Sequence, residues 1–185
     1  MLRKFGIIAV LSLLVTAFAA VPALATQTTT IDLANAPQGT HFVDRGLTPE
    51  CTVTTTTVTC PSAAFELAGV GNTNANANLS VTYTAIVDCF NPGVNPQNPI
   101  ESHTQTATPP PTTATFAPTK NGRLTVQTVS STAPTEAQFQ ALATCPNPNW
   151  TAVVRPGSIT VSSFTYTLTF VGFTEPAITI TGNDP

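Results

Sequence analysis

Four cysteines are the residues in this sequence whose type and spacing could do chemistry most directly: Cys51, Cys60, Cys89 and Cys145. Zinc sites and redox pairs usually contain a C-x-x-C spacing, and the sequence has none. We therefore expect structural disulfides in place of a metal or redox site. Four cysteines allow three pairings.

The segment CTVTTTTVTC reads the same in both directions and predicts a β-hairpin. Folded about its central threonines, it places Cys51 opposite Cys60 at a non-hydrogen-bonded position. The Cα separation there is about 4.5 Å, which suits a disulfide. A two-residue turn or a four-residue loop over Thr54–Thr57 gives the same partners. This pairing leaves Cys89 for Cys145.

The two histidines each lie near an acid in the chain. His41 precedes Asp44 by three residues, and His103 follows Glu101 by two. Either pair could supply the base and orienting carboxylate of a hydrolase. The sequence contains no G-x-S-x-G, H-E-x-x-H, P-loop or G-x-G-x-x-G motif, and its acids are scattered. We therefore predict exposed histidines and assign no catalytic residue, metal ligand or cofactor.

Three aromatic residues support a different hypothesis. Trp150 is the single tryptophan and lies in CPNPNWTAVV, where packing in the core or against a disulfide is favoured over an exposed sugar platform. A carbohydrate- or surface-binding module could use Trp150, Tyr83 and Tyr166. That hypothesis requires at least two of the three to be exposed on one face.

The first 25 residues predict export. Arg3 and Lys4 precede an apolar run, and Ala23-Leu24-Ala25 forms a small-x-small cleavage site. This is the pattern of a secretory signal peptide, and we expect a mature chain of residues 26–185 without a membrane span. The acidic balance, with a net charge of −3 before cleavage, and the lack of a basic run argue against nucleic-acid binding.

The mature composition predicts an all-β protein. Charged residues make up only 8%, while about one residue in five is threonine, a β-branched residue that favours strands. A disordered Ser/Thr/Pro stalk is the alternative. Against it, apolar and polar residues alternate from Leu79 to Phe90, which predicts a half-buried strand. The preceding GNTNANAN, Gly71–Asn78, is predicted to be a loop.

Further turn signals complete the predicted fold. Asn-Gly within Lys120–Arg123 predicts a type I′ hairpin joining strands near Ala114–Lys120 and Arg123–Ser130. In Gly157–Val171 the parity of apolar residues changes at Ser162-Ser163, which predicts a bulge. Weaker strands are expected at 28–33 and 63–70, a polar strand or loop at 101–108, a final strand at 177–181, and one short helix at 134–143. Together these predict one antiparallel two-sheet β-sandwich, immunoglobulin-like or Greek-key.

Several motifs give a resemblance to known proteins: FELAGVGN, DCFNPGVNPQNP, KNGRLTVQT and CPNPNWT. The segment from about residue 65 to 170 resembles a group of uncharacterised proteins secreted by actinomycetes and similar bacteria. The resemblance implies that Cys89 and Cys145 are a recurring pair. It implies no activity.

The sequence thus predicts a secreted or cell-envelope-associated, non-catalytic β-sandwich protein. The alternatives are a carbohydrate- or surface-binding module, with a cell-surface or extracellular glycan as its partner, and a secreted hydrolase that uses a His/Asp or His/Glu pair.

Overall fold

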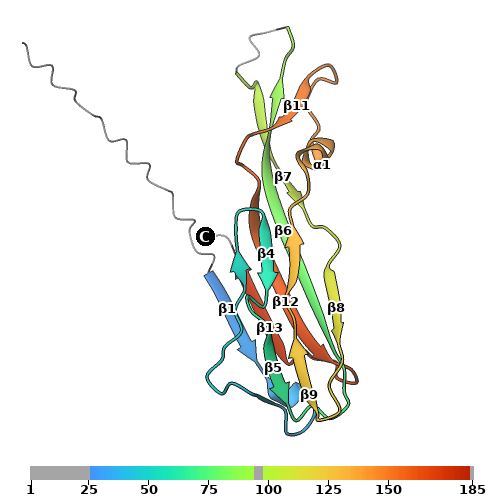
Figure 1. Ribbon diagram of the computed structural model, residues 1–185. Coiled ribbons are helices and arrows are strands. Elements are labelled where there is room, and N and C mark those ends of the chain that lie inside the picture. The colour runs from blue at the N-terminus through green and yellow to red at the C-terminus, as the bar shows by residue number, and fades with distance from the viewer. Residues whose placement is uncertain (1–25, 94–97, 184–185) are drawn as a thin grey trace, which may run out of the picture.

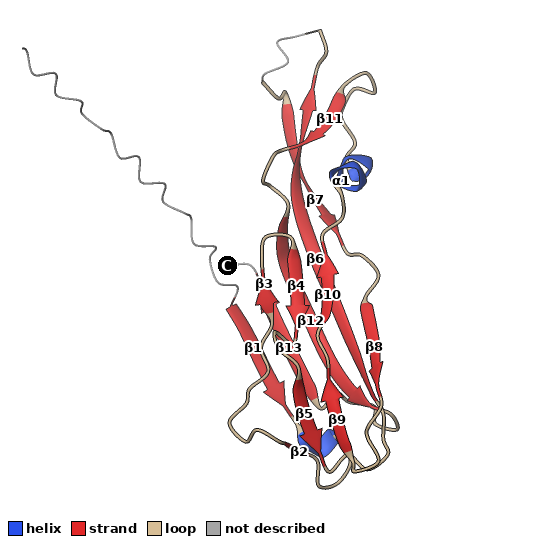
Figure 2. Cartoon of the chain, viewed as in Figure 1, coloured by secondary structure: helices blue, strands red, loops and turns tan. Residues whose placement is uncertain are grey.

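The computed structural model describes residues 26–93 and 98–183, so the predicted signal peptide lies outside the described residues. The chain is built mainly of antiparallel strands with one short α-helix, as predicted (Figure 2). The strands are β1 (Thr26–Ile31), β2 (His41–Phe42), β3 (Thr52–Val53), β4 (Thr57–Cys60), β5 (Phe65–Ala68), β6 (Ala75–Phe90), β7 (Glu101–Ala107), β8 (Thr112–Phe116), β9 (Arg123–Val126), β10 (Val129–Thr132), β11 (Thr151–Val154), β12 (Thr160–Phe170) and β13 (Ile178–Asn183). The helices are the 3-10 helix η1 (Leu33–Asn35) and α1 (Glu136–Leu142).

The larger sheet has seven strands, with the order β1-β13-β12-β6-β11 and with β7 and β8 also paired to β6. The long strand β6 pairs with β12 and then β11 along one edge, and with β8 and β7 along the other. The sheet is therefore five strand positions wide at most, and two of those positions are filled by interrupted strands.

Strand β6 forms because its residues alternate between the two faces of the sheet. Ala75, Ala77, Leu79 and each further odd-numbered residue up to Cys89 are buried, whereas Asn76 and Asn78 are exposed. The predicted loop over 71–78 is therefore wrong in its second half. Asn and Ala are poor strand formers alone, but pairing with β8 and β12 on both sides outweighs that preference.

A second layer covers the buried face of this sheet. It consists of two three-stranded sheets, β10-β4-β3 and β2-β5-β9. Because β4 runs on into β5 and β9 into β10, the two small sheets lie end to end (Figure 1). β4 packs over β12 and β10 over β6, and one cluster of buried residues fills the space between the layers.

The far end of β6 extends beyond the second layer, with β7 and β11 beside it and α1 next to them (Figure 1). Helix α1 begins at a capping box, in which Thr135 accepts a hydrogen bond from the Gln138 amide and Gln138 bonds back to the Thr135 amide. Its Phe139 is fully buried. The short helix predicted at 134–143 is confirmed.

The turn around Asn-Gly is present, but the predicted hairpin is wrong. Strand β8 pairs with β6 and β9 pairs with β5, so the two strands flanking the turn belong to different sheets. Gly122 has φ +68°, while Asn121 has no positive φ, which excludes type I′. The Gly122 amide bonds to the Thr119 carbonyl at 3.0 Å, so the turn carries the chain between layers.

The bulge in β12 lies where the sequence predicts it. Val161 pairs with Tyr83 and Ser163 with Thr82, so Ser162 is the extra residue. After it, Phe164, Tyr166, Leu168 and Phe170 point into the core.

Both disulfides have the predicted partners. In the hairpin, Val53 pairs with Val58, and the Cα atoms of Cys51 and Cys60 are 4.5 Å apart. Cys89 and Cys145 join the end of β6 to the segment after α1. Two disulfides fit an oxidising compartment. None of the helices in the described ranges has the length and apolar character that a membrane span needs.

Candidate functional site

The structure does not join His41 to Asp44. His41 lies at one end of the molecule, where its Nδ1 is 2.8 Å from the carbonyl oxygen of Gly39. The Asp44 carboxylate accepts a hydrogen bond from the Gly46 amide. Each side chain of the predicted pair therefore bonds to nearby backbone in its own turn, and the two do not bond to each other.

His103 and Glu101 do lie together, both partly exposed on β7. The His103 Nε2 is 3.3 Å from Glu101 Oε1, without the geometry of a hydrogen bond. No hydrogen bond in the described part of the chain brings a hydroxyl group to this imidazole. Within the same residues, no group of three or more His, Cys, Asp or Glu is placed to hold a metal ion. This pair alone is not a nucleophile–base arrangement.

Two of the three aromatic residues considered for ligand binding are core residues. Tyr83 and Tyr166 are both 0% exposed, so the trio cannot form an exposed platform. Tyr83 donates a hydrogen bond to Ser131 at 3.1 Å, whereas the Tyr166 hydroxyl has no partner. Burial raises the pKa of both phenols, and for Tyr83 the bond to Ser131 partly opposes this rise.

Trp150 is neither a fully buried core residue nor a fully exposed platform. It is half-buried and lines a hollow of about 420 Å³ together with Cys145, so it packs near the second disulfide while one side of it meets solvent.

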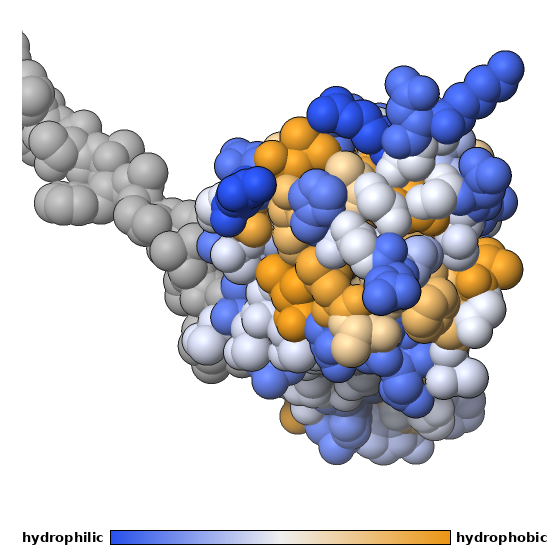
Figure 3. All heavy atoms as spheres, turned by 90° about the horizontal axis from the view of Figure 1, so that it is seen from below, coloured by the Kyte–Doolittle hydropathy of each residue, from blue (hydrophilic) through white to orange (hydrophobic). Residues whose placement is uncertain are grey.

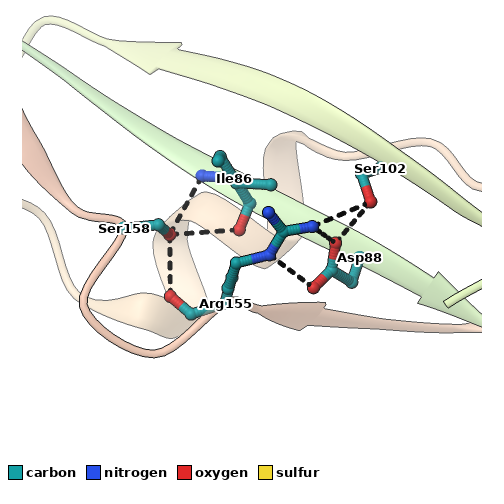
Figure 4. A network of polar contacts seen from close by, with 5 residues as sticks. All are labelled: Ile86, Asp88, Ser102, Arg155 and Ser158. Atoms are coloured by element: carbon teal, nitrogen blue, oxygen red, sulfur yellow. Dashed lines mark hydrogen bonds and ion pairs between the residues drawn. The ribbon is translucent and has the colours of Figure 1, made fainter. Parts of the chain in front are cut away.

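An ion pair that the sequence did not reveal lies at the far end of β6. Arg155, just after β11, donates to both carboxylate oxygens of Asp88, at 2.8 and 3.1 Å (Figure 4). Ser102 on β7 donates to the same carboxylate at 2.6 Å. The Ser158 hydroxyl accepts a hydrogen bond from the Ile86 amide and donates one to the Arg155 carbonyl. These bonds hold the loop between β11 and β12, in which Arg155 lies, against β6.

This network acts as a clasp across three strand positions. The hydrogen bonds from Arg155 hold the pKa of Asp88 below its usual range, against the opposing effect of burial. A buried carboxylate that accepts three hydrogen bonds and has a lowered pKa is a poor general base, because its charged form is already stabilised. The available signal in the sequence was a single acid within an otherwise uncharged strand, and nothing there pointed to Arg155.

The outer face of the large sheet is a further surface feature. We call it the outer polar face and define it by the side chains that point away from the core on β1, β8 and β13, on β6 from Asn76 to Thr84, and on β12 after its bulge. These are Thr26, Thr28, Thr30, Asn76, Asn78, Ser80, Thr82, Thr84, Thr113, Thr115, Ser163, Thr165, Thr167, Thr169, Thr179, Thr181 and Asn183. All are threonine, serine or asparagine, and none is charged.

Strand register aligns these side chains in rows across the sheet. One row runs through Thr113, Asn78, Thr167, Thr179 and Thr30. The next rows are Ser80, Thr165, Thr181 and Thr28, and then Thr82, Ser163, Asn183 and Thr26. Neighbouring strands are about 4.8 Å apart, and side chains on one face repeat roughly every 6.7 Å along a strand. The face is therefore a grid of neutral polar groups.

The middle of this grid has free hydrogen-bonding capacity. At its margins, Thr115 donates to Asn76 at 2.8 Å, and Thr84 bonds to Thr160 at 3.2 Å. In the rows of Thr167 and Thr165, no side chain has a hydrogen-bond partner among the described residues. These hydroxyl and amide groups can bond to a ligand without breaking a bond inside the protein.

Two other surfaces are hollowed. The end that holds η1 and β2 exposes hydrophobic residues among polar ones (Figure 3), and a hollow of about 280 Å³ there is lined by Phe42, Leu47 and Phe65. A groove of about 530 Å³ lies between the Thr108–Pro110 bend and the start of α1. Neither contains a cluster of chemically reactive groups.

No protein-family model, curated protein or solved structure matches the chain. The resemblance to secreted actinomycete proteins therefore stays a prediction.

Proposed function

We propose that the protein is a secreted, non-catalytic binding protein that attaches to a neutral, hydroxyl-rich polysaccharide through its outer polar face. The observation that carries the proposal is the grid of threonine, serine and asparagine side chains, whose two central rows have no hydrogen-bond partner among the described residues. Export rests on the signal-peptide pattern, and the two disulfides support an oxidising destination.

The chemistry of the face favours an uncharged partner. The grid has no basic or acidic side chain with which to attract a nucleic acid, an anionic polymer or a charged lipid surface. Hydroxyl and amide groups act as both donors and acceptors, which matches the hydroxyl groups of a sugar polymer. The methyl groups of the threonines supply small apolar contacts between these polar groups.

The face lacks an aromatic side chain, so each contact is weak. Binding strength must then come from many contacts along an extended polymer, which converts weak local binding into avidity. The twist between neighbouring strands, about 20–25°, limits any single polymer chain to a few rows. We therefore expect insoluble or long polymers to bind much better than short oligosaccharides.

Adsorption to insoluble polysaccharide tests the proposal. The probes are cellulose and chitin, with carboxylated alginate as a charged comparison. We expect the mature protein to adsorb to at least one neutral polymer and not to alginate. Thr165→Glu with Thr181→Glu places two negative charges in adjacent positions of one row. We expect adsorption to fall by about tenfold or more, because binding would strip water from two carboxylates without giving them an oppositely charged partner.

A matched control carries the same change elsewhere. Thr52→Glu with Thr55→Glu adds two charges at exposed positions of the β3–β4 hairpin in the other layer. This variant should adsorb like the unmodified protein. Equal loss in both double variants, or no adsorption of the unmodified protein to either neutral polymer, contradicts the proposed function.

A further inference from the structure

Strand β1 forms an open edge of the large sheet, beside β13 alone (Figure 1). The Asp32 amide bonds to the Ala177 carbonyl just beyond the strand, which sets the phase of the antiparallel ladder. Hydrogen-bonded pairs alternate along such a ladder, so Thr26, Thr28 and Thr30 bond to β13. The amide and carbonyl groups of Gln27, Thr29 and Ile31 therefore face outward.

These outward groups are unprotected. Among the described residues, no backbone hydrogen bond reaches them. The segment TQTTTI contains no charge and no proline, the usual features that block pairing at an edge. The opposite edge of the sheet differs, since three prolines interrupt it at Pro109–Pro111 and Thr112 bonds across to the Ser130 carbonyl.

One symmetric register uses all three outward residues. Pairing β1 with β1 of a second copy about a two-fold axis at Thr29 places Gln27 opposite the partner's Ile31 and Thr29 opposite its own copy. A two-fold axis at Thr28 would leave Ile31 unpaired within the strand. The register through Thr29 is therefore favoured, because it gives a hydrogen-bond partner to the backbone groups of all three outward residues.

The same register brings opposite charges together. It sets Thr26 opposite the partner's Asp32. Cleavage after Ala25, as the signal-peptide pattern predicts, would give Thr26 a free α-ammonium group. Asp32 forms no ion pair within the part of the chain that the structure describes. The dimer would then hold two such pairs, one at each end of the seam, each formed by one group from each copy.

We propose that the mature protein self-associates as a two-fold dimer through antiparallel pairing of β1 with β1, in the register centred on Thr29. The dimer joins two large sheets into one and continues the rows of the outer polar face across the seam, Thr28 beside the partner's Thr30. A six-residue seam is smaller than a standard interface, so association is weak and concentration-dependent.

Disulfide trapping tests the register. Thr28 and the partner's Thr30 form a non-hydrogen-bonded pair, the same kind of position that holds Cys51 and Cys60 with their Cα atoms 4.5 Å apart. Mixing folded Thr28→Cys with folded Thr30→Cys under mild oxidation should give a cross-linked heterodimer. Thr181→Cys, on the neighbouring strand, should cross-link with neither. A Thr28→Cys homodimer in place of the heterodimer overturns the register.

Sedimentation equilibrium of the mature protein tests the association itself. We expect the mass to rise toward that of a dimer with concentration. Ile31→Pro removes an outward amide without removing a bond to β13, and should raise the dimer dissociation constant by about tenfold or more. Ile31→Ala keeps the amide and should dimerise normally. A mass that stays monomeric at all concentrations, or a dimer unaffected by Ile31→Pro, overturns the proposal. The outcome does not depend on polysaccharide binding.

Discussion

At the scale of single residues, the two buried tyrosines can be compared directly. Tyr83 donates to Ser131, whereas the Tyr166 hydroxyl is buried without a partner. Tyr83→Phe should lower the free energy of unfolding by about 1 kcal/mol, since it leaves Ser131 unsatisfied. Tyr166→Phe should raise the free energy of unfolding by about 1 kcal/mol, because it removes a hydroxyl that is buried without a hydrogen-bond partner. Urea denaturation of both variants measures the difference, and destabilisation by Tyr166→Phe would show that the hydroxyl has a partner.

Asp88 should make stability depend on acid. Its folded pKa lies below its usual value, so its contribution is complete above the unfolded pKa of about 3.9 and is lost as the pH falls through the lower folded value. Asp88→Asn should cost about 2 kcal/mol at pH 7 and much less near pH 2.

Thermal unfolding of Asp88→Asn at several pH values measures this gap. The control is Glu175→Gln at an exposed acid that forms no ion pair within the described residues, and it should have little effect at either pH. A gap between the unmodified protein and Asp88→Asn that stays constant with pH contradicts the assigned role of the clasp.

The residue scale is also where prediction from sequence reached least far. The cysteine pairing followed from local symmetry, because the two halves of one hairpin face each other. The burial of Tyr83 and Tyr166 and the pairing of Asp88 with Arg155 depend on contacts between strands distant in the chain. A side chain's partner across a sheet is set by register, which single residues do not encode.

At the scale of the elements, the two disulfides should contribute unequally to the stability of the fold. By the loop-entropy estimate, the Cys51–Cys60 bridge stabilises the fold by about 2.7 kcal/mol and the Cys89–Cys145 bridge by about 4.2 kcal/mol. Replacing each pair by serine should therefore lower the melting temperature more for the second pair. Calorimetry on the two double variants gives the order, and a larger loss from the hairpin pair would contradict it.

Gly182 on β13 lies directly beneath the ring of Phe164, its partner on β12. A Cβ atom at this position would collide with that ring. Gly182→Ala should therefore cost about 2 kcal/mol, as measured by urea denaturation. Adding Phe164→Leu to that variant should recover part of the loss, since the two changes share one contact. Strictly additive costs would mean that the ring does not limit this position.

Elements were predictable where the pattern was local. The alternation in β6, the change of parity in β12 and the capping signals of α1 all lie within a few residues. The start of β6 was missed because Asn76 and Asn78 look like loop residues, yet they occupy the solvent face of a central strand. The turn at Asn121-Gly122 was located correctly, but its type I′ geometry and the hairpin around it were wrong, because the flanking strands pair elsewhere.

At the scale of the whole molecule, composition and structure give the same account. A chain with few charged residues and abundant threonine folds into two layers, and the register of the large sheet aligns those threonines into rows. The all-β class was predictable from composition. The outer polar face was not, because its rows combine five strands from separate parts of the sequence.

Threonine-methyl NMR tests the central claim, that the outer polar face binds a neutral polysaccharide, most directly. The mature protein is titrated with soluble fragments of the polymer to which it adsorbs. We predict chemical-shift changes concentrated on the methyl groups of Thr165, Thr167, Thr179 and Thr181. Changes confined to the surroundings of Trp150 or to the groove near Pro109, with those four methyl groups unchanged, would contradict the account.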